Sequence, residues 1–549
     1  TPSIEKKQRI IYNCYMNSSF FDFYPHTATE DAVVISHKDL PHELLSISDA
    51  ALYRLVSESF KRLSFTFTRS HIEHLIQAVL SDNASNNDRY VCASLLKNAQ
   101  CASSYELPLC QDTGIAHIFS WIPPNVLLTD NARSIISKAV SDVYRDHNLR
   151  YSTTIPLNFY DEKDPRNNLP CQTFLFNEKL NPSFSDEAEP HASFLFCAKG
   201  GGSSNKTVFI QGTKADLTEE KFDALLKEKI KALGTSACPP YTIAVVAGGL
   251  SPEQNLMTLK LATCGCIIQN EHSFRDEKLE QRVMEIAEKA GYGAQFGGTK
   301  AAVEAVVIRL PRHGASCPIS IGVSCSAHRN LKTFITKDGL YIEKTVTELS
   351  GIEGFSQAVS FADNKIDQVM HINTSSGINK LIQEISYLKP GTRLYLSGNI
   401  LVARDAAHAR WKKLIDDGKD LPDYAVRYPI CYAGPSRTPT GFPLGSFGPT
   451  TAGRMDSYAE ILMQRNAARI TLAKGNRSST WKEGCIKYNS CYLGTIGGAA
   501  ALITSEYIVS AQVIDYHDLG MEAVHLVEVK NLPVFMLING KGEDFYEQV

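Results

Sequence analysis

The chain has 549 residues, too many for one hydrophobic core, which predicts two or three domains. Its 43% hydrophobic and 21% charged residues are typical of a soluble globular protein and exclude a disordered or fibrous one. A net charge of −3 indicates neither a nucleic-acid partner nor a membrane partner. No apolar run approaches the roughly 18 residues of a membrane span. The first ten residues, TPSIEKKQRI, lack the apolar core of a secretory signal, so we expect a cytoplasmic or mitochondrial-matrix protein that is not secreted.

The chain contains 14 cysteines, too few for a disulfide scaffold of this length. None forms a C-x-x-C pair that would indicate zinc or a redox dithiol. We therefore expect mostly buried thiols, and any metal site must be assembled from distant loops.

The first 45 residues match no recognisable pattern, and we expect an N-terminal arm at 1–45. From about Ile47 to Lys97 apolar residues recur at helical spacing, and ADLTEEKFDALLKEKIKAL predicts a further amphipathic helix. The runs YTIAVVAGG, AVEAVVIRLP and PISIGVS have the length of strands and end in Gly, Pro or Ser. Helices that alternate with short buried strands predict an α/β (α+β) domain, which we place at 46–360.

A polar connector at 361–388 precedes a fresh pattern, ISYLKPGTRLYLSGNILVARDAAHARW, which predicts a strand, a turn and a helix. We place a domain boundary at this connector. Residues 389–549 are rich in Gly and in strand-like runs such as GGAAALITSEYIVSAQVIDY, so we expect a smaller, β-rich domain there.

Three cysteines differ from the others in their surroundings: Cys110 in LCQDTG, Cys238 in ACPPY and Cys325 in GVSCSAH. Each lies at a junction marked by Gly, Pro or Ser, where a thiol can point off a well-held loop. Spacing alone leaves two interpretations, three unrelated buried thiols or three ligands of an iron–sulfur cluster. In a cluster, three thiolates would leave one iron without a protein ligand and able to polarise a substrate. Cys264 and Cys266 lie in the apolar run LATCGCII, which suits packing better.

Two glycine-rich stretches are candidate anion-binding sites. AKGGGSSNK, at 198–206, offers consecutive backbone N–H groups of the kind that bind anions, but it also fits an ordinary loop. GAQFGGTK, at 293–300, ends with its last two residues in the wrong order for a phosphate-binding loop. A nucleotide site is therefore not expected.

Three cations near the end of the chain lie among small residues: Arg404 in VARDAAHAR, Arg454 in GPTTAGRMD and Lys474 in LAKGNRSST. Each alone is typical of a solvated surface. Together they match a clamp for a dicarboxylate, because guanidinium groups bind carboxylates in a bidentate manner and a lysine adds a point charge.

The motifs LCQDTG, KGGGS.NK, ACPPY, RLPRHGASCPISIGVSCSAHRN, LYLSGNILVARDAAHAR, GPTTAGRMD and AKGNRS together resemble the class I, iron–sulfur fumarate hydratases, which share their architecture with L-tartrate dehydratases. The resemblance runs from about residue 50 to the C-terminus. It implies a large two-lobed N-terminal α/β domain that holds the cluster and a smaller C-terminal swivelling β/β/α domain.

The resemblance also implies the site. It makes Cys110, Cys238 and Cys325 the ligands of a [4Fe-4S] cluster whose fourth iron contacts the substrate. The residues implied to hold the substrate carboxylates are Gln111, Arg150, Gly202, Arg404, Arg454 and Lys474. Thr450, Asp112 and His313 match the positions around the hydroxyl group and the migrating proton; Thr450 is our first choice as the base, with Asp112 or His313 as its relay or acting directly. Such enzymes are homodimers with the site at the subunit interface, so Arg150 or His313 could come from the other subunit.

Two positions depart from the family pattern. GGAAAL at 497–502 replaces a frequent GGPAAL, and His328 replaces the acidic residue that usually follows SCSA. Neither is an implied cluster ligand or clamp residue.

The expected activity is the reversible hydration of fumarate to S-malate by an oxygen-sensitive cluster. L-tartrate or mesaconate hydration on the same scaffold is the alternative, because one hydroxyl or methyl group shifts preference by only about 1–3 kcal/mol. Outside the enzymes, the alternatives are a non-catalytic iron–sulfur sensor and an anion-binding module without cofactor. A sensor would need no dicarboxylate clamp.

Overall fold

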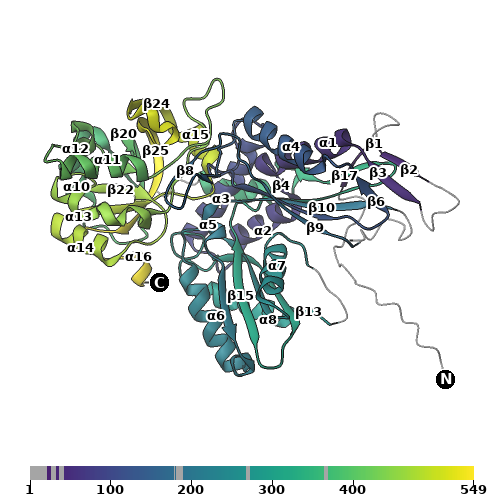
Figure 1. Ribbon diagram of the computed structural model, residues 1–549. Coiled ribbons are helices and arrows are strands. Elements are labelled where there is room, and N and C mark those ends of the chain that lie inside the picture. Colours follow the sequence, from purple (N-terminus) through teal and green to yellow (C-terminus); the bar gives the residue numbers. More distant parts are fainter. Residues whose placement is uncertain are drawn as a thin grey trace.

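A computed structural model describes residues 21–25, 32–35, 43–178, 180, 190–267, 272–363 and 369–548 (Figure 1). These residues mix helices and strands, which confirms the predicted α/β class. In Figure 1 the C-terminal part, green to yellow, lies at the left, and the rest of the chain is built on two sheets at the right and below. Most of the predicted arm at 1–45 lies outside the described residues.

One sheet has six strands, and helices α1 (Asp49–Phe65) and α4 (Ala132–Asp146) pack with it around one apolar core. Helix α1 begins at Asp49 because the Ser48 hydroxyl accepts the N–H of Ala51. The strands in spatial order are β1 (Phe21–Pro25), β17 (Gly339–Glu343), β16 (Asn330–Ile335), β10 (Ala192–Lys199), β5 (Ile115–Trp121) and β9 (Gln172–Phe176).

A second sheet has five strands and is covered on both faces. Ile243 and Val245 of its central strand join the core formed with α6 (Glu219–Leu233) and α8 (Glu277–Glu288), whereas Ala244 and Val246 join the core formed with α7 (Pro252–Ala262). Because both faces are buried, the strand reads as the continuous apolar run YTIAVVAGG. The strands in order are β11 (Val208–Gly212), β15 (Cys317–Ser324), β12 (Tyr241–Gly249), β14 (Ala302–Arg312) and β13 (Phe274–Arg275).

Three helices, α2 (Arg69–Leu80), α3 (Asn86–Ala102) and α9 (Phe355–Asp363), pack against one another. The buried Asp88 caps α3 and also accepts backbone N–H groups from Ala294 at 2.7 Å and Thr299 at 2.9 Å. The glycine-rich stretch 293–300 therefore surrounds a carboxylate of the chain itself.

The C-terminal sheet has seven strands, of which β20 to β23 run parallel. Strand β25 pairs antiparallel with both β23 and β20, so these strands close on themselves. The strands in order are β19 (Met370–Asn373), β20 (Arg393–Val402), β21 (Ile430–Cys431), β22 (Ile470–Ala473), β23 (Cys491–Gly494), β25 (Val524–Ile538) and β24 (Ile508–Asp515). The helices of this part are α10 (Ile378–Ile385), α11 (Asp405–Asp416), α12 (Asp423–Arg427), α13 (Ala459–Gln464), α14 (Ser479–Tyr488), α15 (Ala500–Tyr507) and α16 (Phe545–Gln548).

Two stretches of this part differ from the sequence expectations. The stretch 361–388, predicted as a linker, includes β19 and α10. The strand-like interpretation of GGAAALITSEYIVSAQVIDY is wrong for its first half, because 500–507 forms α15 and only 508–515 forms β24. Alanine and leucine are strong helix formers, and α15 packs on α3, so both local preference and tertiary packing favour the helix.

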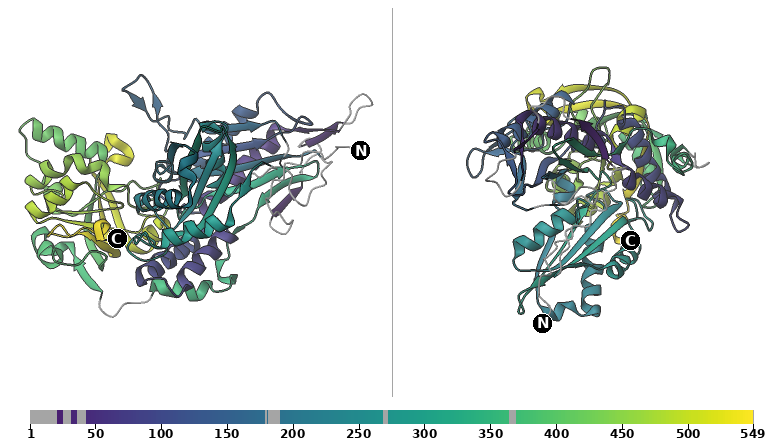
Figure 2. Two further views of the ribbon diagram at one scale, coloured as in Figure 1. Left: turned by 90° about the horizontal axis from the view of Figure 1, so that it is seen from below. Right: turned by 90° about the vertical axis from the view of Figure 1, so that its right-hand side faces the viewer.

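The remaining elements are short. They are the small sheets β2 (Ala32–Ile35), β3 (Leu44–Ile47) with β6 (Val126–Leu128), β4 (Phe67–Thr68) with β18 (Thr345–Val346), and β7 (Ile155–Pro156) with β8 (Glu162–Lys163), and the 3-10 helices η2 (Lys214–Leu217), η3 (Leu349–Gly351), η4 (Thr374–Ser376), η5 (Ala452–Tyr458) and η6 (His517–Glu522). In the left view of Figure 2, the hairpin of β7 and β8, in blue, projects from the body of the molecule. Within the described ranges, no helix has the length and apolar character needed to cross a membrane.

The C-terminal part contains a buried imidazole that predicts a pH dependence of stability. His408 lies among Trp411, Tyr432 and Tyr458, and its Nδ1 lies 3.0 Å from the carbonyl oxygen of Arg404. Burial lowers the pKa of His408 to about 4, against the opposing effect of that carbonyl.

Below about pH 6.5 His408 is protonated in the unfolded chain but stays neutral in the folded chain. The free energy of unfolding therefore falls as the pH drops towards 4. We expect this residue to contribute about 2 kcal/mol of the stability lost between pH 7.5 and pH 5. His408→Asn keeps a donor for the Arg404 carbonyl but cannot be protonated. Urea unfolding at both pH values should show a smaller loss in the variant; equal losses would contradict the assignment.

Candidate active site

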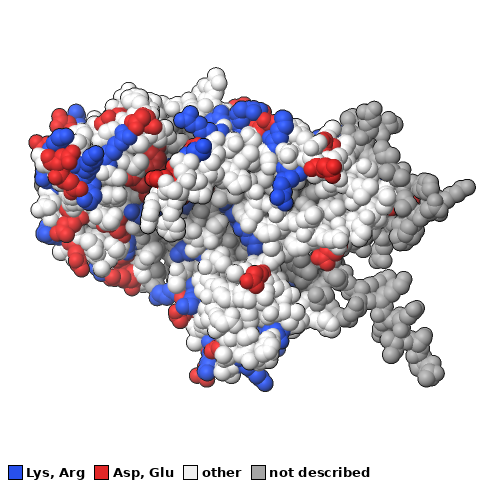
Figure 3. Space-filling model, in the orientation of Figure 1, with Lys and Arg blue, Asp and Glu red and all other residues white. Residues whose placement is uncertain are grey.

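A pocket of about 300 Å³ lies where loops of the two N-terminal sheets meet the C-terminal sheet. In Figure 3 basic side chains are visible in the recess between these parts. The pocket brings together every non-cysteine residue that the sequence implied, with the exception of His313. Its lining consists of Gln111, Asp112, Ile115, Arg150, Ser152, Lys199, Gly201, Gly202, Asn205, Lys206, Ser236, Arg404, Pro449, Thr450, Thr451, Arg454 and Lys474.

The C-terminal half supplies its pocket residues from one edge of its sheet. Arg404 follows β20, and Lys474 follows β22. Thr451 forms a β-bridge with Lys474, which brings the neighbouring Thr450 to the same edge. The carboxyl ends of parallel strands are a common place for ligand sites, because the loops that follow them converge.

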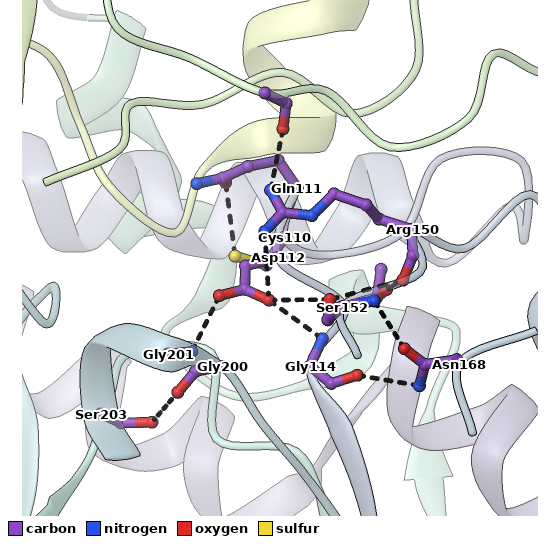
Figure 4. A network of polar contacts seen from close by, with 12 residues as sticks. Cys110, Gln111, Asp112, Gly114, Arg150, Ser152, Asn168, Gly200, Gly201 and Ser203 are labelled. Carbon is purple, nitrogen blue, oxygen red and sulfur yellow. Dashed lines mark hydrogen bonds and ion pairs between the residues drawn. The ribbon is translucent and has the colours of Figure 1, made fainter. Parts of the chain in front are cut away.

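The N-terminal half contributes a carboxylate that is already held by several donors (Figure 4). Asp112 follows α3 in the loop before β5, and it accepts the N–H of Gly201 at 2.9 Å and that of Gly114 at 3.2 Å. Ser152 donates its hydroxyl to Asp112 at 3.3 Å, and the Arg150 guanidinium lies 3.7 Å from the same carboxylate. Much of the carboxylate's bonding capacity is therefore used within the chain.

Burial by itself would raise the pKa of Asp112. The charges of Arg150 and Arg329 and the N–H of Gly201 oppose this effect and lower the pKa to about 2. Gly201 begins the short helix α5 (Gly201–Ser204), in the stretch that offered an anion nest. One N–H of this stretch, that of Gly201, thus binds Asp112. At Gly200 a Cβ atom would lie 2.8 Å from the Asp112 carboxylate, so the close approach requires glycine.

The cations of the pocket are held in place but keep unused donors. Arg404 forms an ion pair with Glu522 at 2.9 Å, and Arg454 forms one with Asp405 at 3.2 Å. Arg150 donates to the carbonyl of Gly434 at 3.1 Å. In the described part of the chain, the buried Nε atoms of Arg150 and Arg404 have no hydrogen-bond partner. Buried unpaired donors are costly, which favours an anionic ligand that accepts from them.

The three singled-out thiols lie next to pocket residues, and Cys238 and Cys325 are close enough to affect the pKa of Cys110. Cys110 precedes Gln111 of the pocket, Cys238 lies in the loop between α6 and β12, and Cys325 follows β15. The Lys474 ammonium lies 2.8 Å from the Cys238 sulfur, and thiolates at all three positions would raise the pKa of Lys474 against the lowering effect of burial. Burial raises the pKa of Cys110 to about 11 and also raises that of Cys238.

The surroundings of the thiols fit a cofactor that carries negative charge. Arg329 is only 4% exposed and its Nε and Nη1 atoms find no hydrogen-bond partner among the described residues, yet its charge acts on Cys110. In the same ranges no three His, Cys, Asp or Glu side chains are close enough to share one metal ion. Each thiolate of a four-iron cluster binds a different iron, so a cluster needs no such close group. The donor set, three thiols beside unpaired cations, therefore suits a cluster better than a single ion.

Three residues differ from the sequence expectations, one predicted residue outside the pocket and two pocket residues that were not selected as site residues. His313 is exposed in the turn between β14 and β15 and does not line the pocket of its own chain, so its predicted role would need a second copy of the chain. Lys199 and Ser152 line the pocket and were missed. Ser152 lies two residues after Arg150, and Lys199 precedes the Gly200–Gly202 run, so proximity to a chosen motif was the available signal.

Two family models match the chain, and together they cover most of it. The family model described as fumarate hydratase (fumerase) matches residues 53–333, and the model described as the fumarase C-terminus matches 350–549. The chain is 42% identical over 529 residues to "Fumarate hydratase class I, anaerobic" of Escherichia coli, covering 95% of this chain and 94% of the relative. It is 41% identical over 520 residues to "Fumarate hydratase 1, mitochondrial" of Leishmania major, covering 92% of each.

The chain belongs to the class I fumarate hydratase family. This confirms the resemblance seen in the sequence motifs. A third of the chain, 31%, is also 31% identical to a "Putative L(+)-tartrate dehydratase subunit beta" of Methanocaldococcus jannaschii, over 90% of that protein. A segment of this fumarate hydratase family member is thus similar to a separate subunit elsewhere.

The unpaired donors of the pocket predict that Arg404 contributes to anion binding. Arg404→Gln should weaken S-malate binding by about tenfold or more, because it removes a buried charge-assisted contact. Isothermal titration of the anaerobic protein measures this. Arg410→Gln is the matched control. Arg410 lies in α11, which follows Arg404 directly, and forms an exposed ion pair with Asp518, so this variant should bind malate normally. Equal affinities for both variants would show that Arg404 does not contact the anion.

Proposed function

We propose that this member of the family catalyses the reversible hydration of fumarate to S-malate with a [4Fe-4S] cluster. The observation that carries the proposal is the position of Lys474, which lines the cationic pocket and also lies 2.8 Å from the Cys238 sulfur. A dicarboxylate in the pocket would thus lie beside the three thiols. Family membership supports the same reaction, because the relatives are named fumarate hydratases.

The residues that would hold the cluster are Cys110, Cys238 and Cys325, with Arg329 and Lys474 as neighbouring cations. When bound, the cluster would supply a Lewis-acidic iron that polarises the hydroxyl group gained or lost by the substrate. The protein residues orient the diacid. Arg150, Arg404, Arg454 and Lys474 line the pocket and give it enough positive charge to hold two carboxylates at once. Gln111 and the backbone at Gly202 complete the proposed binding residues.

Hydration also requires a group that moves a proton at the carbon next to a carboxylate. We assign this role to Thr450, whose hydroxyl lines the pocket and donates to the carbonyl of Tyr432 at 3.2 Å. To act as the base, Thr450 would first lose its hydroxyl proton to solvent, and Arg454 and Lys474 would stabilise the resulting alkoxide. The alkoxide then takes the proton from the substrate carbon and becomes a hydroxyl again. Asp112 suits this role less, since its oxygens already bind Gly201, Gly114 and Ser152. Asp112 instead orients Arg150.

The proposal includes the assembly that the family resemblance implies. We propose a homodimer in which His313 of one subunit reaches the site of the other, because His313 is exposed and outside the pocket of its own chain. We also propose that the two N-terminal sheets act as two lobes of one domain and that the C-terminal sheet swivels against it. A cytoplasmic or mitochondrial-matrix location stays a prediction; one relative is named mitochondrial.

Tartrate or mesaconate hydration is the second candidate. The similarity of about a third of the chain to a putative tartrate dehydratase subunit favours keeping it. An iron–sulfur sensor fits less well, because a sensor has no use for the cations Arg404, Arg454 and Lys474. A cofactor-free anion-binding module would not explain why the buried Arg329, with unpaired donors among the described residues, lies near the three thiols.

The deciding experiment is turnover by protein that is loaded with iron and sulfide without air. We expect fumarate hydration, followed as loss of fumarate absorbance, to exceed the rates with tartrate and mesaconate. Brown, iron-loaded protein without any hydratase activity would favour a sensor. Colourless protein would favour an anion-binding module.

Cysteine variants provide the matched control for that experiment. Serine at Cys110, Cys238 or Cys325 should abolish both activity and bound iron. Serine at Cys92 or Cys431, which are buried in α3 and β21, should leave both nearly unchanged. Similar losses in all five variants would contradict the assignment of ligands.

The role of Thr450 gives a further prediction. Thr450→Val removes the hydroxyl but keeps the shape, so we expect kcat to fall by about 10² to 10⁴ while the iron content stays unchanged. Thr450→Ser should recover much of the rate. Steady-state kinetics together with an iron assay measure both; a Thr450→Val enzyme with normal kcat would assign the proton transfer elsewhere.

A further inference from the structure

A turn of the C-terminal sheet lies directly against the thiol-bearing loops of the N-terminal half. Gly497 and Gly498 come after β23 and before α15. A Cβ atom at Gly497 would lie 2.2 Å from the Cys238 sulfur, and one at Gly498 would lie 2.5 Å from the hydroxyl of Ser326, next to Cys325. Gly498 also has φ +89, which favours glycine. Both positions therefore admit no side chain.

A buried glutamine joins this turn to the loop of Cys238. The side chain of Gln295 donates to the carbonyl of Pro239 at 3.0 Å and to that of Gly497 at 2.9 Å. It also accepts the N–H of Gly497 at 2.7 Å. Gln295 has φ 101, in the left-handed region that side chains rarely adopt. Such strain persists only where the surroundings hold the residue firmly.

A buried asparagine joins the same turn to the loop of Cys110. Asn98 of α3 donates to the carbonyl of Leu109 at 3.0 Å and to that of Gly498 at 3.2 Å. It accepts the N–H of Leu502, in α15, at 3.0 Å. Gln295 and Asn98 therefore both bind the turn at 497–498. Gln295 joins it to the residue after Cys238, and Asn98 joins it to the residue before Cys110.

We propose that the Gly497–Gly498 turn forms one wall of the cluster site, and that Gln295 and Asn98 are positioning residues that couple docking of the C-terminal sheet to retention of the cluster. This inference rests on the proposed function, since it requires the cluster. Coupling between two binding events is reciprocal. A bound cluster should therefore stabilise the docked turn, and a well-docked turn should slow loss of the cluster.

The first test measures how fast iron leaves the loaded, full-length protein in the presence of a chelator and without air. Gln295→Leu and Asn98→Leu keep the size of the side chain but remove all its hydrogen bonds. We expect iron loss to be about tenfold faster, as buried hydrogen bonds that position the loops are lost. Gln295→Glu keeps the acceptor for Gly497 and should lie between Gln295→Leu and the wild type.

Asn255→Leu is the matched control. Asn255 is equally buried and its amide donates to the carbonyls of Val246 and Gly248, away from the turn. This variant should lower the stability to urea without speeding iron loss. If Asn255→Leu loses iron as fast as Gln295→Leu, general destabilisation explains the effect and the inference is overturned.

The second test needs no variant. Hydrogen–deuterium exchange of the wild-type chain, with and without the cluster, should show slower exchange at 497–502 in the loaded form. Unchanged exchange at 497–502 in protein that does hold iron would overturn the inference while leaving the proposed function intact. Wild-type protein that binds no iron and sulfide would overturn both.

Discussion

The contact between the Lys474 ammonium and the Cys238 sulfur, at 2.8 Å, joins the two halves of the molecule at the point where chemistry would occur. Lys474 stands at the end of a parallel strand of the C-terminal sheet, and Cys238 lies in a loop that leads into the central strand of the five-stranded sheet. Neither half alone contains a complete site. The fold therefore has to bring the C-terminal sheet against the loops of the N-terminal half to complete the site.

Several buried groups show how that relation is maintained. Asp112, Gln295 and Asn98 use nearly all their bonding capacity on backbone groups of neighbouring loops. In contrast, the arginines nearest the pocket keep donors without partners in the described structure. An unpaired buried donor costs about 1–3 kcal/mol, so the free pocket is primed to accept an anion. Among the described residues, Arg150 and Arg404 thus combine one partnered side-chain group with one unpaired Nε atom.

Short motifs selected residues from distant parts of the chain that the fold brings to one pocket. Each implied pocket residue except His313 lies in the pocket, because a local motif fixes where a loop residue sits at the end of its strand. Strands such as β12 and β14 were also recognisable from their apolar runs. Residues 500–507 were given a strand-like interpretation although their alanines and leucine favour a helix, which packing against α3 reinforces.

The roles of Gln295 and Arg329 could not be read from the sequence, because both depend on contacts between residues far apart in the chain. Gln295 pairs with Gly497, and Arg329 acts on Cys110. The local sequence around Gln295 is a glycine-rich loop that indicated only a failed phosphate-binding pattern. The nest at 198–206 showed a similar limit, since the anion it binds is the distant Asp112.

The central claim is that the chain provides three thiolate ligands and leaves one iron of the cluster to the substrate. Mössbauer spectroscopy of protein loaded with isotopically labelled iron, recorded with and without S-malate, tests it most directly. The account predicts that malate changes the signal of one iron site and leaves the others unchanged. A spectrum unaffected by saturating malate, or one that shows every iron with the same thiolate environment, would contradict it.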